Sequence, residues 1–166
     1  MKTDGSFSLS NIRDGSYSIE VQSSCSRCYL KSAITNGLDL VSGSLEISSG
    51  ASPQIQIVYS SNSSTLSGNV TENDKFPAGS ALVVLLPDES SRKTSSRYYK
   101  AVTDQNGHFE IQGIAPGRYR AFAWEGIEQA AAGETEFITS GKGEGQAVEL
   151  DANQKKTVQL ALLPLD

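Results

Sequence analysis

The sequence contains one histidine, two cysteines and one tryptophan in 166 residues, so it has few of the side chains from which enzymes and metal centres are usually built. Multi-histidine metal sites are excluded, because such a site needs several ligands at defined spacing. A serine triad needs a histidine as its base, and His108 stands alone just after a predicted turn. We therefore predict no catalytic residue, no metal site and no cofactor.

The chain also lacks a surplus of basic residues and a long apolar run. Its 14 Lys and Arg are outnumbered by 19 Asp and Glu, which provides no positive field for nucleic acid or anionic lipid. No stretch approaches the roughly 18 to 20 consecutive apolar residues that cross a bilayer. We expect no nucleic-acid partner and no membrane insertion. A hydrophobic fraction of 37% with 20% charged residues suits a folded chain with a polar surface.

What the sequence does contain is an internal repeat. Residues 4–17 align without a gap to residues 106–119 at an offset of 102, and residues 45–57 align to 148–160 at an offset of 103. Self-similarity of this kind predicts two copies of one structural unit. The identical pairs in the first alignment are Gly5/Gly107, Phe7/Phe109, Ile12/Ile114, Gly15/Gly117 and Tyr17/Tyr119.

Apolar residues alternate with polar residues in both copies, whereas helical spacing is nearly absent. Alternation with a period of two is typical of half-buried strands, so the predicted fold class is all-β. Asn106-Gly107 and Pro116-Gly117 are predicted to form hairpin turns, because glycine tolerates the positive φ angles of tight reversals. The predicted fold is an antiparallel Greek-key β-sandwich. Strands are predicted around residues 7–9, 17–21, 45–47, 55–57, 66–70, 81–86, 97–103, 108–113, 118–124, 148–150 and 158–162.

The two copies differ in length. Three predicted strands precede the Asn106-Gly107 turn, whereas three residues precede Asp4-Gly5 at the equivalent point of the first copy. A polar Ser/Asn run lies between the copies and is typical of a linker. We therefore expect residues 1–60 to form a partial sandwich unit that lacks its N-terminal strands. Residues 61–64 are then a linker, and residues 65–166 are a complete unit.

Four segments of the second copy resemble the carboxypeptidase regulatory-like domain, a transthyretin-like or prealbumin-like β-sandwich that recurs in exported bacterial proteins. They are residues 67–70, 77–83, 103–109 and 113–119. The resemblance implies an immunoglobulin-like accessory module, located outside the cell or in the periplasm or cell envelope, whose partners are neighbouring β-sandwich domains of the same chain. Turn or core roles are expected for Gly68, Asp104, Asn106, Gly107, Phe109, Gly117 and Tyr119.

The predicted strand at residues 118–124 has one unusual face. If Tyr119 points into the core, alternation places Arg120, Phe122 and Trp124 on the opposite face. The equivalent residues of the first copy, Ser18, Glu20 and Gln22, are polar. Two hypotheses stay open. Exposed rings, with Tyr98 and Arg120, form a carbohydrate-binding platform, or residues 127–143 fold over the rings as a lid.

Cys25 and Cys28 form the other candidate site. A redox C-x-x-C pair works because one thiol sits at a helix N-terminus, and this pair lies in a β context. A zinc site would need a second pair, which the sequence lacks. We predict a disulfide between Cys25 and Cys28 if the protein is exported, and two incidental thiols otherwise.

The sequence thus predicts a non-catalytic structural or interaction module of an exported bacterial multidomain protein. The alternative is a carbohydrate-binding module, and a glycan or a cell-envelope protein is then a further partner. Exposure of Trp124 distinguishes the two functions, because a buried ring cannot stack on a sugar.

Overall fold

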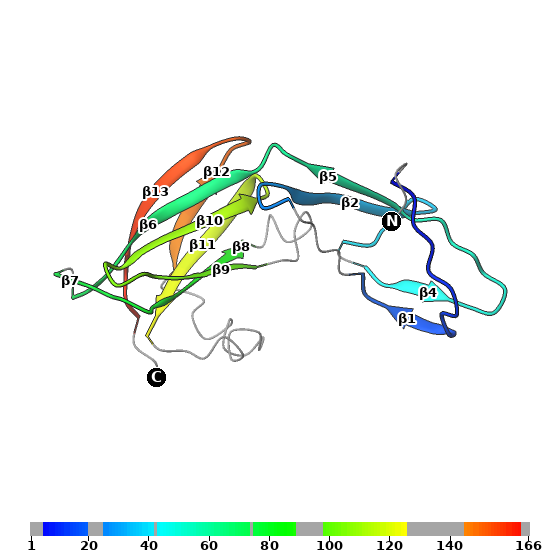
Figure 1. The fold of residues 1–166 in the computed structure, drawn as a ribbon, viewed down its shortest axis with the longest axis horizontal. Coiled ribbons are helices and arrows are strands. Elements are labelled where there is room, and N and C mark those ends of the chain that lie inside the picture. Colours follow the sequence, from blue (N-terminus) through cyan, green and yellow to red (C-terminus); the bar gives the residue numbers. More distant parts are fainter. Residues whose placement is uncertain are drawn as a thin grey trace.

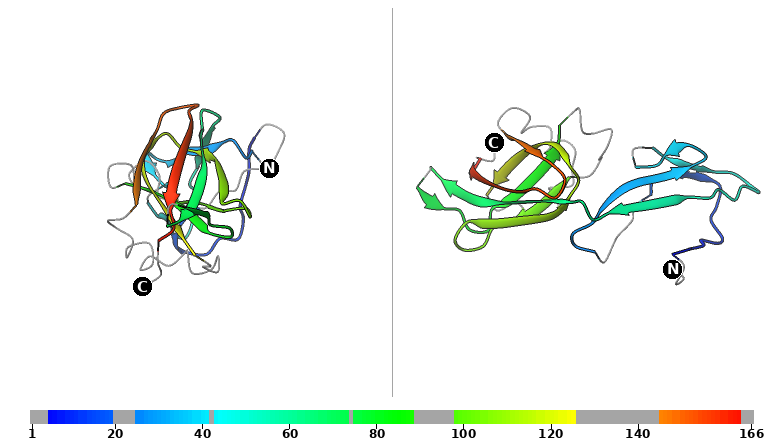
Figure 2. Two further views of the ribbon diagram at one scale, coloured as in Figure 1. Left: turned by 90° about the vertical axis from the view of Figure 1, so that its left-hand side faces the viewer. Right: turned by 90° about the horizontal axis from the view of Figure 1, so that it is seen from above.

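The computed structural model describes residues 5–19, 25–41, 43–73, 75–88, 98–125 and 145–163. These residues form strands and no helix, so the all-β prediction is confirmed. The molecule is elongated, with strands β6–β13 at one end and β1–β5 at the other (Figures 1 and 2). Within the described part of the chain, no helix is present that could span a membrane.

Strands β6–β13 form a β-sandwich, here called the C-terminal sandwich. One sheet has the order β10-β6-β13, with β7 paired to β6, and the other has the order β12-β11-β8-β9. Strand β13 runs parallel to β6, whereas the other pairings in this sandwich are antiparallel. The strands are β6 (Ser64–Glu72), β7 (Phe76–Pro77), β8 (Leu82–Pro87), β9 (Tyr99–Val102), β10 (His108–Ile114), β11 (Gly117–Trp124), β12 (Gln146–Leu150) and β13 (Lys155–Ala161).

The core of the C-terminal sandwich lies between its two sheets. Along β6, β10, β12 and β13 buried residues alternate with more exposed ones, as the alternation in the sequence predicts. On β11 the inward residues are Tyr119, Ala121 and Ala123, and all three are buried. Strand β8 is buried along its whole length, because its other face packs in a second apolar cluster.

The two turns predicted as hairpins join different sheets instead. Asn106-Gly107 leads from β9 to β10, and Pro116-Gly117 leads from β10 to β11, and β10 belongs to the sheet opposite β9 and β11. The hairpin prediction is therefore wrong. Gly107 does adopt the expected positive φ, at +74°. A glycine turn reverses the chain, but it does not decide which strand the returning segment pairs with. Here β10 pairs with the distant β6.

Strands β1–β5 form a smaller arrangement, here called the N-terminal unit. Its sheets have the orders β1-β4 and β3-β2-β5. Ala33, Leu40 and Leu45 form a small buried core, with half-buried isoleucines around it. The strand predicted at residues 7–9 is absent, and Phe7 and Leu9 are exposed. The strands are β1 (Gly15–Tyr17), β2 (Tyr29–Thr35), β3 (Leu38–Asp39), β4 (Leu45–Ile47) and β5 (Gln56–Ser60).

One strand pairing is the same in the two halves at the sequence offsets of 102 and 103. Gly15 pairs with Ile47 where β1 meets β4, and the equivalent Gly117 pairs with Leu150 where β11 meets β12. The backbone conformations match as well. Positive φ angles occur at the equivalent pairs Gly5/Gly107, Asn11/Gly113 and Gly50/Asn153.

A tyrosine also makes the same hydrogen bond in both halves. The hydroxyl of Tyr17 donates to the carbonyl oxygen of Arg13 at 2.9 Å. The hydroxyl of Tyr119 donates to the carbonyl oxygen of Ala115 at 2.6 Å. Each bond spans four residues and closes the corner before its strand, in the manner of the tyrosine corner of immunoglobulin-like domains.

Candidate functional site

The residues predicted to bind carbohydrate lie on the outer face of the β12-β11-β8-β9 sheet. The register places Arg120, Phe122 and Trp124 of β11 opposite Leu86, Val84 and Leu82 of β8. Tyr98 directly precedes β9, whose Tyr99 pairs with Leu85. The four predicted residues are therefore brought to one face of one sheet.

The two aromatic rings on this face are buried. Phe122 is 2% exposed and Trp124 is 5% exposed, and they pack with Leu82, Val84 and Leu86 into what we call the outer-face cluster. Their rings stack in parallel, with centroids 5.2 Å apart. A Cβ atom added at Gly145 would overlap the Phe122 ring, so the backbone of Gly145 lies directly on it.

The exposed aromatic platform predicted from the sequence is therefore not formed, because a sugar ring has no access to Phe122 or Trp124. The outward face of β11 alternates as predicted, but its apolar members serve a second core. The alternative hypothesis, a lid at residues 127–143, concerns a segment that lies outside the described residues.

The two polar members of the predicted platform remain accessible. Arg120 is exposed, and its guanidinium donates to the carbonyl oxygen of Gly145 at 3.1 Å. Tyr98 is exposed as well. Both residues border the outer-face cluster. Of the four residues predicted to bind sugar, these two are the ones that could contact a ligand from solvent.

The turn at Asp104 is held by its own side chain. One carboxylate oxygen accepts from the backbone N–H groups of Asn106, at 2.8 Å, and His108, at 2.9 Å. These two hydrogen bonds hold the pKa of Asp104 below its ordinary value, and the nearby His108 acts in the same direction. This oxygen of Asp104 is therefore used to hold the backbone of the turn. No cluster of three or more His, Cys, Asp or Glu residues suited to a metal occurs among the described residues.

Tyr119 and Tyr99 together satisfy the backbone of Ala115. The hydroxyl of Tyr119 donates to the carbonyl oxygen of Ala115, and the N–H of Ala115 donates to the hydroxyl of Tyr99 at 3.0 Å. The two rings meet edge to face. Burial, with a smaller contribution from Tyr99, raises the pKa of Tyr119 far above its ordinary value. Tyr119 is thus a neutral structural residue of the core and is not available as an acid or base.

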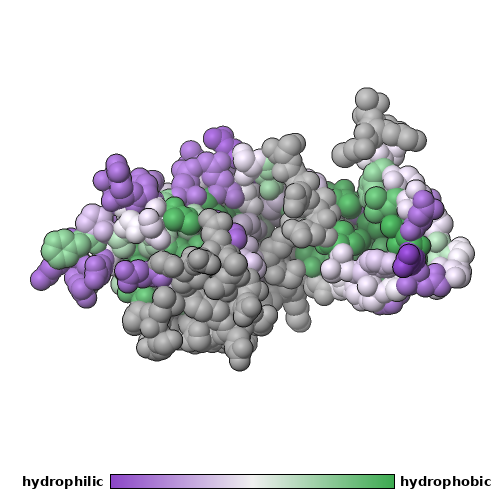
Figure 3. Space-filling model, turned by 60° about the horizontal axis from the view of Figure 1, so that its bottom comes forward, coloured by the Kyte–Doolittle hydropathy of each residue, from purple (hydrophilic) through white to green (hydrophobic). Residues whose placement is uncertain are grey.

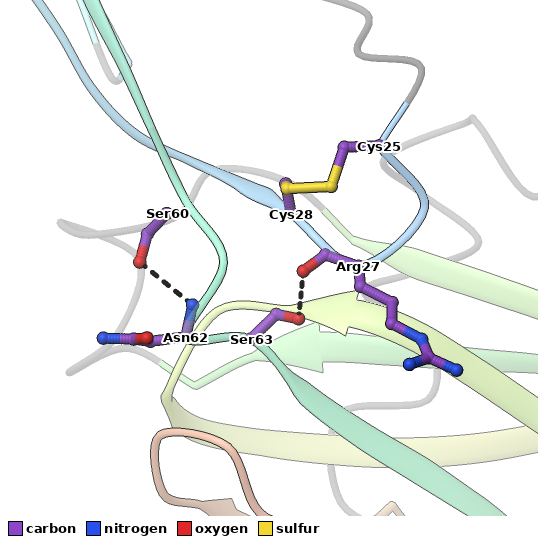
Figure 4. Close-up of a disulfide and its surroundings, with 6 residues drawn as sticks. All are labelled: Cys25, Arg27, Cys28, Ser60, Asn62 and Ser63. Carbon is purple, nitrogen blue, oxygen red and sulfur yellow. Dashed lines mark hydrogen bonds between the residues drawn. A yellow bond between two sulfur atoms is a disulfide. The ribbon is translucent and has the colours of Figure 1, made fainter.

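The loop at residues 25–28, here called the disulfide loop, lies where the N-terminal unit meets the C-terminal sandwich. Cys25 and Cys28 form a disulfide, with their Cα atoms 5.4 Å apart. The side chain of Ser63, just before β6, donates to the carbonyl oxygen of Arg27 at 2.6 Å (Figure 4). The loop therefore binds the connection between β5 and β6.

The disulfide loop also touches β10. A Cβ atom added at Gly113 would lie 2.8 Å from the carbonyl oxygen of Ser26 and 3.2 Å from that of Cys28. Gly113 has a φ of +72°, so glycine is favoured there for conformation as well as for space. Sequence analysis did not assign roles to Ser63 or Gly113, because their contacts to the loop join residues far apart in the chain.

A family model described as polysaccharide lyase family 4, domain II, matches residues 74–154, which lie in the C-terminal sandwich. Among curated proteins none matches the chain.

Several solved structures are similar to this chain. A candidate carbohydrate-binding protein from Pseudomonas aeruginosa is 16% identical, with a TM-score of 0.40 over 60% of this chain and 88% of that one. The major pilin subunit of Bacillus cereus is 14% identical, with a TM-score of 0.41 over 76% of this chain and 34% of the pilin. A minor pilin of Streptococcus agalactiae is 16% identical, with a TM-score of 0.39 over 71% of this chain and 57% of the pilin. The chain thus spans less than two thirds of either pilin.

Proposed function

We propose that the chain is a non-catalytic spacer or scaffold of tandem β-sandwich units in an exported bacterial multidomain protein. The observation that carries this proposal is the disulfide loop, which contacts both the connection at Ser63 and strand β10 at Gly113. A spacer has to hold its neighbours at a defined orientation. A cross-linked loop seated at the junction opposes bending between the two halves.

The tandem arrangement is supported by the equivalences along the backbone. The matching register of β1-β4 and β11-β12, the three pairs of positive φ angles and the two tyrosine corners all fall at the offsets seen in the sequence. On this proposal residues 1–60 are a partial unit, 61–64 a linker and 65–166 a complete unit. A carboxypeptidase regulatory-like ancestry of both units is part of the same proposal.

The proposed location outside the cytoplasm is supported by the disulfide, because such bonds persist in oxidising compartments. The match to domain II of polysaccharide lyases is in keeping with an accessory role, since a second domain accompanies others in its chain. The proposed partners are then the neighbouring domains of the same polypeptide.

The test of the spacer function is the orientation of the two halves in solution. Residual dipolar couplings of the oxidised protein should fit one common alignment tensor for both halves. The variant Cys25→Ala/Cys28→Ala should need two tensors, because its opened loop no longer braces the junction. Ser26→Ala keeps the disulfide and is the matched control. A single tensor in the double variant, or two tensors in the wild type, would contradict the proposal.

Carbohydrate binding is the second candidate function, and the exposed pair Tyr98 and Arg120 is the observation that favours it. A ligand there would rest on one tyrosine ring and hydrogen-bond to the guanidinium, without Phe122 or Trp124. A glycan array decides this possibility. Binding that is lost in Tyr98→Ala and kept in Lys100→Ala would establish it, and an array without binding would leave the spacer function alone.

A further inference from the structure

We propose that the outer edge of β5 is a docking site for an extended peptide strand that runs parallel to β5 and has the side-chain pattern of β6. The inference rests on the tandem arrangement proposed above. The occupant we infer is an extended peptide segment with apolar residues at alternate positions and a glycine that faces the carbonyl group of Ile55.

The first step is to establish which edge of β5 is open. The carbonyl oxygen of Ala33 in β2 accepts from the N–H of Leu40 at 2.7 Å, so the main-chain groups of Ala33 point toward β3. Ala33 stands opposite Ile57 of β5. Two residues directly opposite each other in an antiparallel pair either exchange both main-chain hydrogen bonds or neither, so the N–H and C=O of Ile57 point away from β2. In the described part of the chain, β5 is the last strand of its sheet on that side.

The second step is to ask what covers the equivalent edge in the C-terminal sandwich. At the offset of 103, Ile55 and Ile57 correspond to Val158 and Leu160 of β13. Main-chain hydrogen bonds join Gln154 and Leu162 to β6. Both lie an even number of residues from Val158 and Leu160, so the main-chain groups of all four residues point to the same side of the strand. The edge of β13 that corresponds to the open edge of β5 is therefore covered by β6, which lies parallel to it. Strand β2 occupies the other edge of β5.

The third step concerns the apolar surface that lies open in the N-terminal unit. Phe7, Ile12 and Tyr17 are 44%, 46% and 37% exposed, whereas their equivalents Phe109, Ile114 and Tyr119 are 2%, 0% and 2% exposed. Hydrophobic residues can be seen at the surface of this unit, on the right in Figure 3. In the C-terminal sandwich β6 contributes the fully buried Leu66 and Val70 to the core. An occupant of the β5 edge needs comparable apolar side chains.

The fourth step explains the glycine. A Cβ atom added at Gly68 of β6 would overlap the carbonyl oxygen of Val158, so the two strands approach more closely there than any other residue allows. Ile55 stands at the position of Val158. Pro53 stands at the position of Lys156 and has no N–H, so the proposed ladder begins at Ile55. Strand addition to an exposed edge is a general mode of peptide recognition, with main-chain bonds for affinity and alternate side chains for specificity.

The experiment uses the intact protein and a peptide with the sequence of β6, Ser64–Glu72. Hydrogen exchange is followed with increasing peptide concentration. The amide of Ile57 should exchange at least about tenfold more slowly at saturation, because its N–H enters a ladder. The same peptide with Gly68→Val should give no protection. Unchanged exchange at Ile57 with the β6 peptide, or equal protection by both peptides, would overturn the proposal.

Two proline variants of the protein separate docking from folding. Ile57→Pro removes the outward N–H, so peptide protection is read in this variant at the amide of Ile55, where it should be lost. The substitution also removes a side chain that packs on the small buried core, so the amides of β2 report whether the N-terminal unit stays folded. Gln56→Pro is the matched control, because Gln56 pairs with Ile34 of β2 and its N–H points into the existing sheet. It should disrupt the unit. If both variants leave peptide binding intact, the peptide binds elsewhere and the proposal fails.

Self-association is the competing outcome. If Ile57 becomes protected as the protein concentration rises without peptide, a second copy occupies the edge and the inferred peptide partner is wrong. The orientation of the two halves is measured separately by dipolar couplings. A protein with one alignment tensor and no peptide binding would overturn the docking site alone, and peptide binding with two tensors would overturn the spacer function alone.

Discussion

Tyr119 shows at the scale of a single residue how a side chain can be part of the core and of a turn at once. Its ring is buried between the sheets, and its hydroxyl satisfies the carbonyl group of Ala115. Each role has its own cost when lost. Removal of the ring leaves a cavity, and removal of the hydroxyl alone leaves a buried acceptor without its partner.

We expect Tyr119→Ala to destabilise the C-terminal sandwich by about 3 to 5 kcal/mol. Tyr119→Phe should cost about 1 to 3 kcal/mol, because it keeps the ring and removes only the hydrogen bond. Urea unfolding of the two variants measures both values. A loss below about 1 kcal/mol for the alanine variant would mean that the inward face of β11 is misassigned.

The same residue predicts a pH dependence in alkali. The folded pKa of Tyr119 lies above its ordinary value of 10.0. Below that value the phenol is neutral in both states and its contribution to stability is complete. Above it the unfolded chain releases a proton that the folded chain retains, so the free energy of unfolding should fall by about 1.4 kcal/mol per pH unit from this residue.

Urea unfolding at a series of alkaline pH values measures this slope, and tyrosinate absorbance reports the ionisation. Tyr119→Phe is the control, since it lacks the group and should show a smaller slope by about one proton. Identical slopes for the wild type and Tyr119→Phe would show that Tyr119 ionises freely in the folded protein.

At the scale of strands and turns, local pattern was a good guide only where one neighbour decides the outcome. Alternation placed Tyr119 inward correctly, because a strand has just two faces. It could not show whether the outward Phe122 faces water or a second cluster, since that depends on what packs on the sheet. The glycine turns at Gly107 and Gly117 were located, but the sheets they join depend on pairing with the distant β6.

One hairpin was missed although its signal was present. Asn36 and Gly37 connect β2 to β3, with φ angles of 47° and 80°. Asn-Gly between two strands is a strong short-range hairpin signal. The contact of Gly113 with the disulfide loop had no local signal at all.

At the scale of the whole molecule, the two halves differ in how completely their strands cover one another. The C-terminal sandwich encloses its core between two sheets, with β8 buried along its whole length and alternate residues of β6 buried. The N-terminal unit has a small core and apolar residues at its surface. Local stability follows buried apolar contacts and paired main-chain groups, so the halves should differ in their resistance to opening.

We expect residues 64–166 alone to fold cooperatively, with the roughly 5 to 15 kcal/mol of an ordinary small domain. Residues 1–60 alone should exchange their amide protons near the unprotected rate, because a partial sandwich cannot bury enough apolar surface to offset chain entropy. In the intact chain the amides of β1–β5 should exchange faster than those of β6, β10 and β13. Hydrogen exchange of both fragments and of the whole chain checks this order.

The β6 peptide gives this comparison a control within the same molecule. If the fast amide exchange of residues 1–60 results from the open edge of β5, the peptide should slow exchange across β2 and β5. Exchange in the C-terminal sandwich should stay unchanged. Protection of isolated residues 1–60 as a monomer without peptide would contradict the partial-unit proposal, and the N-terminal unit would then be a small fold that is stable by itself.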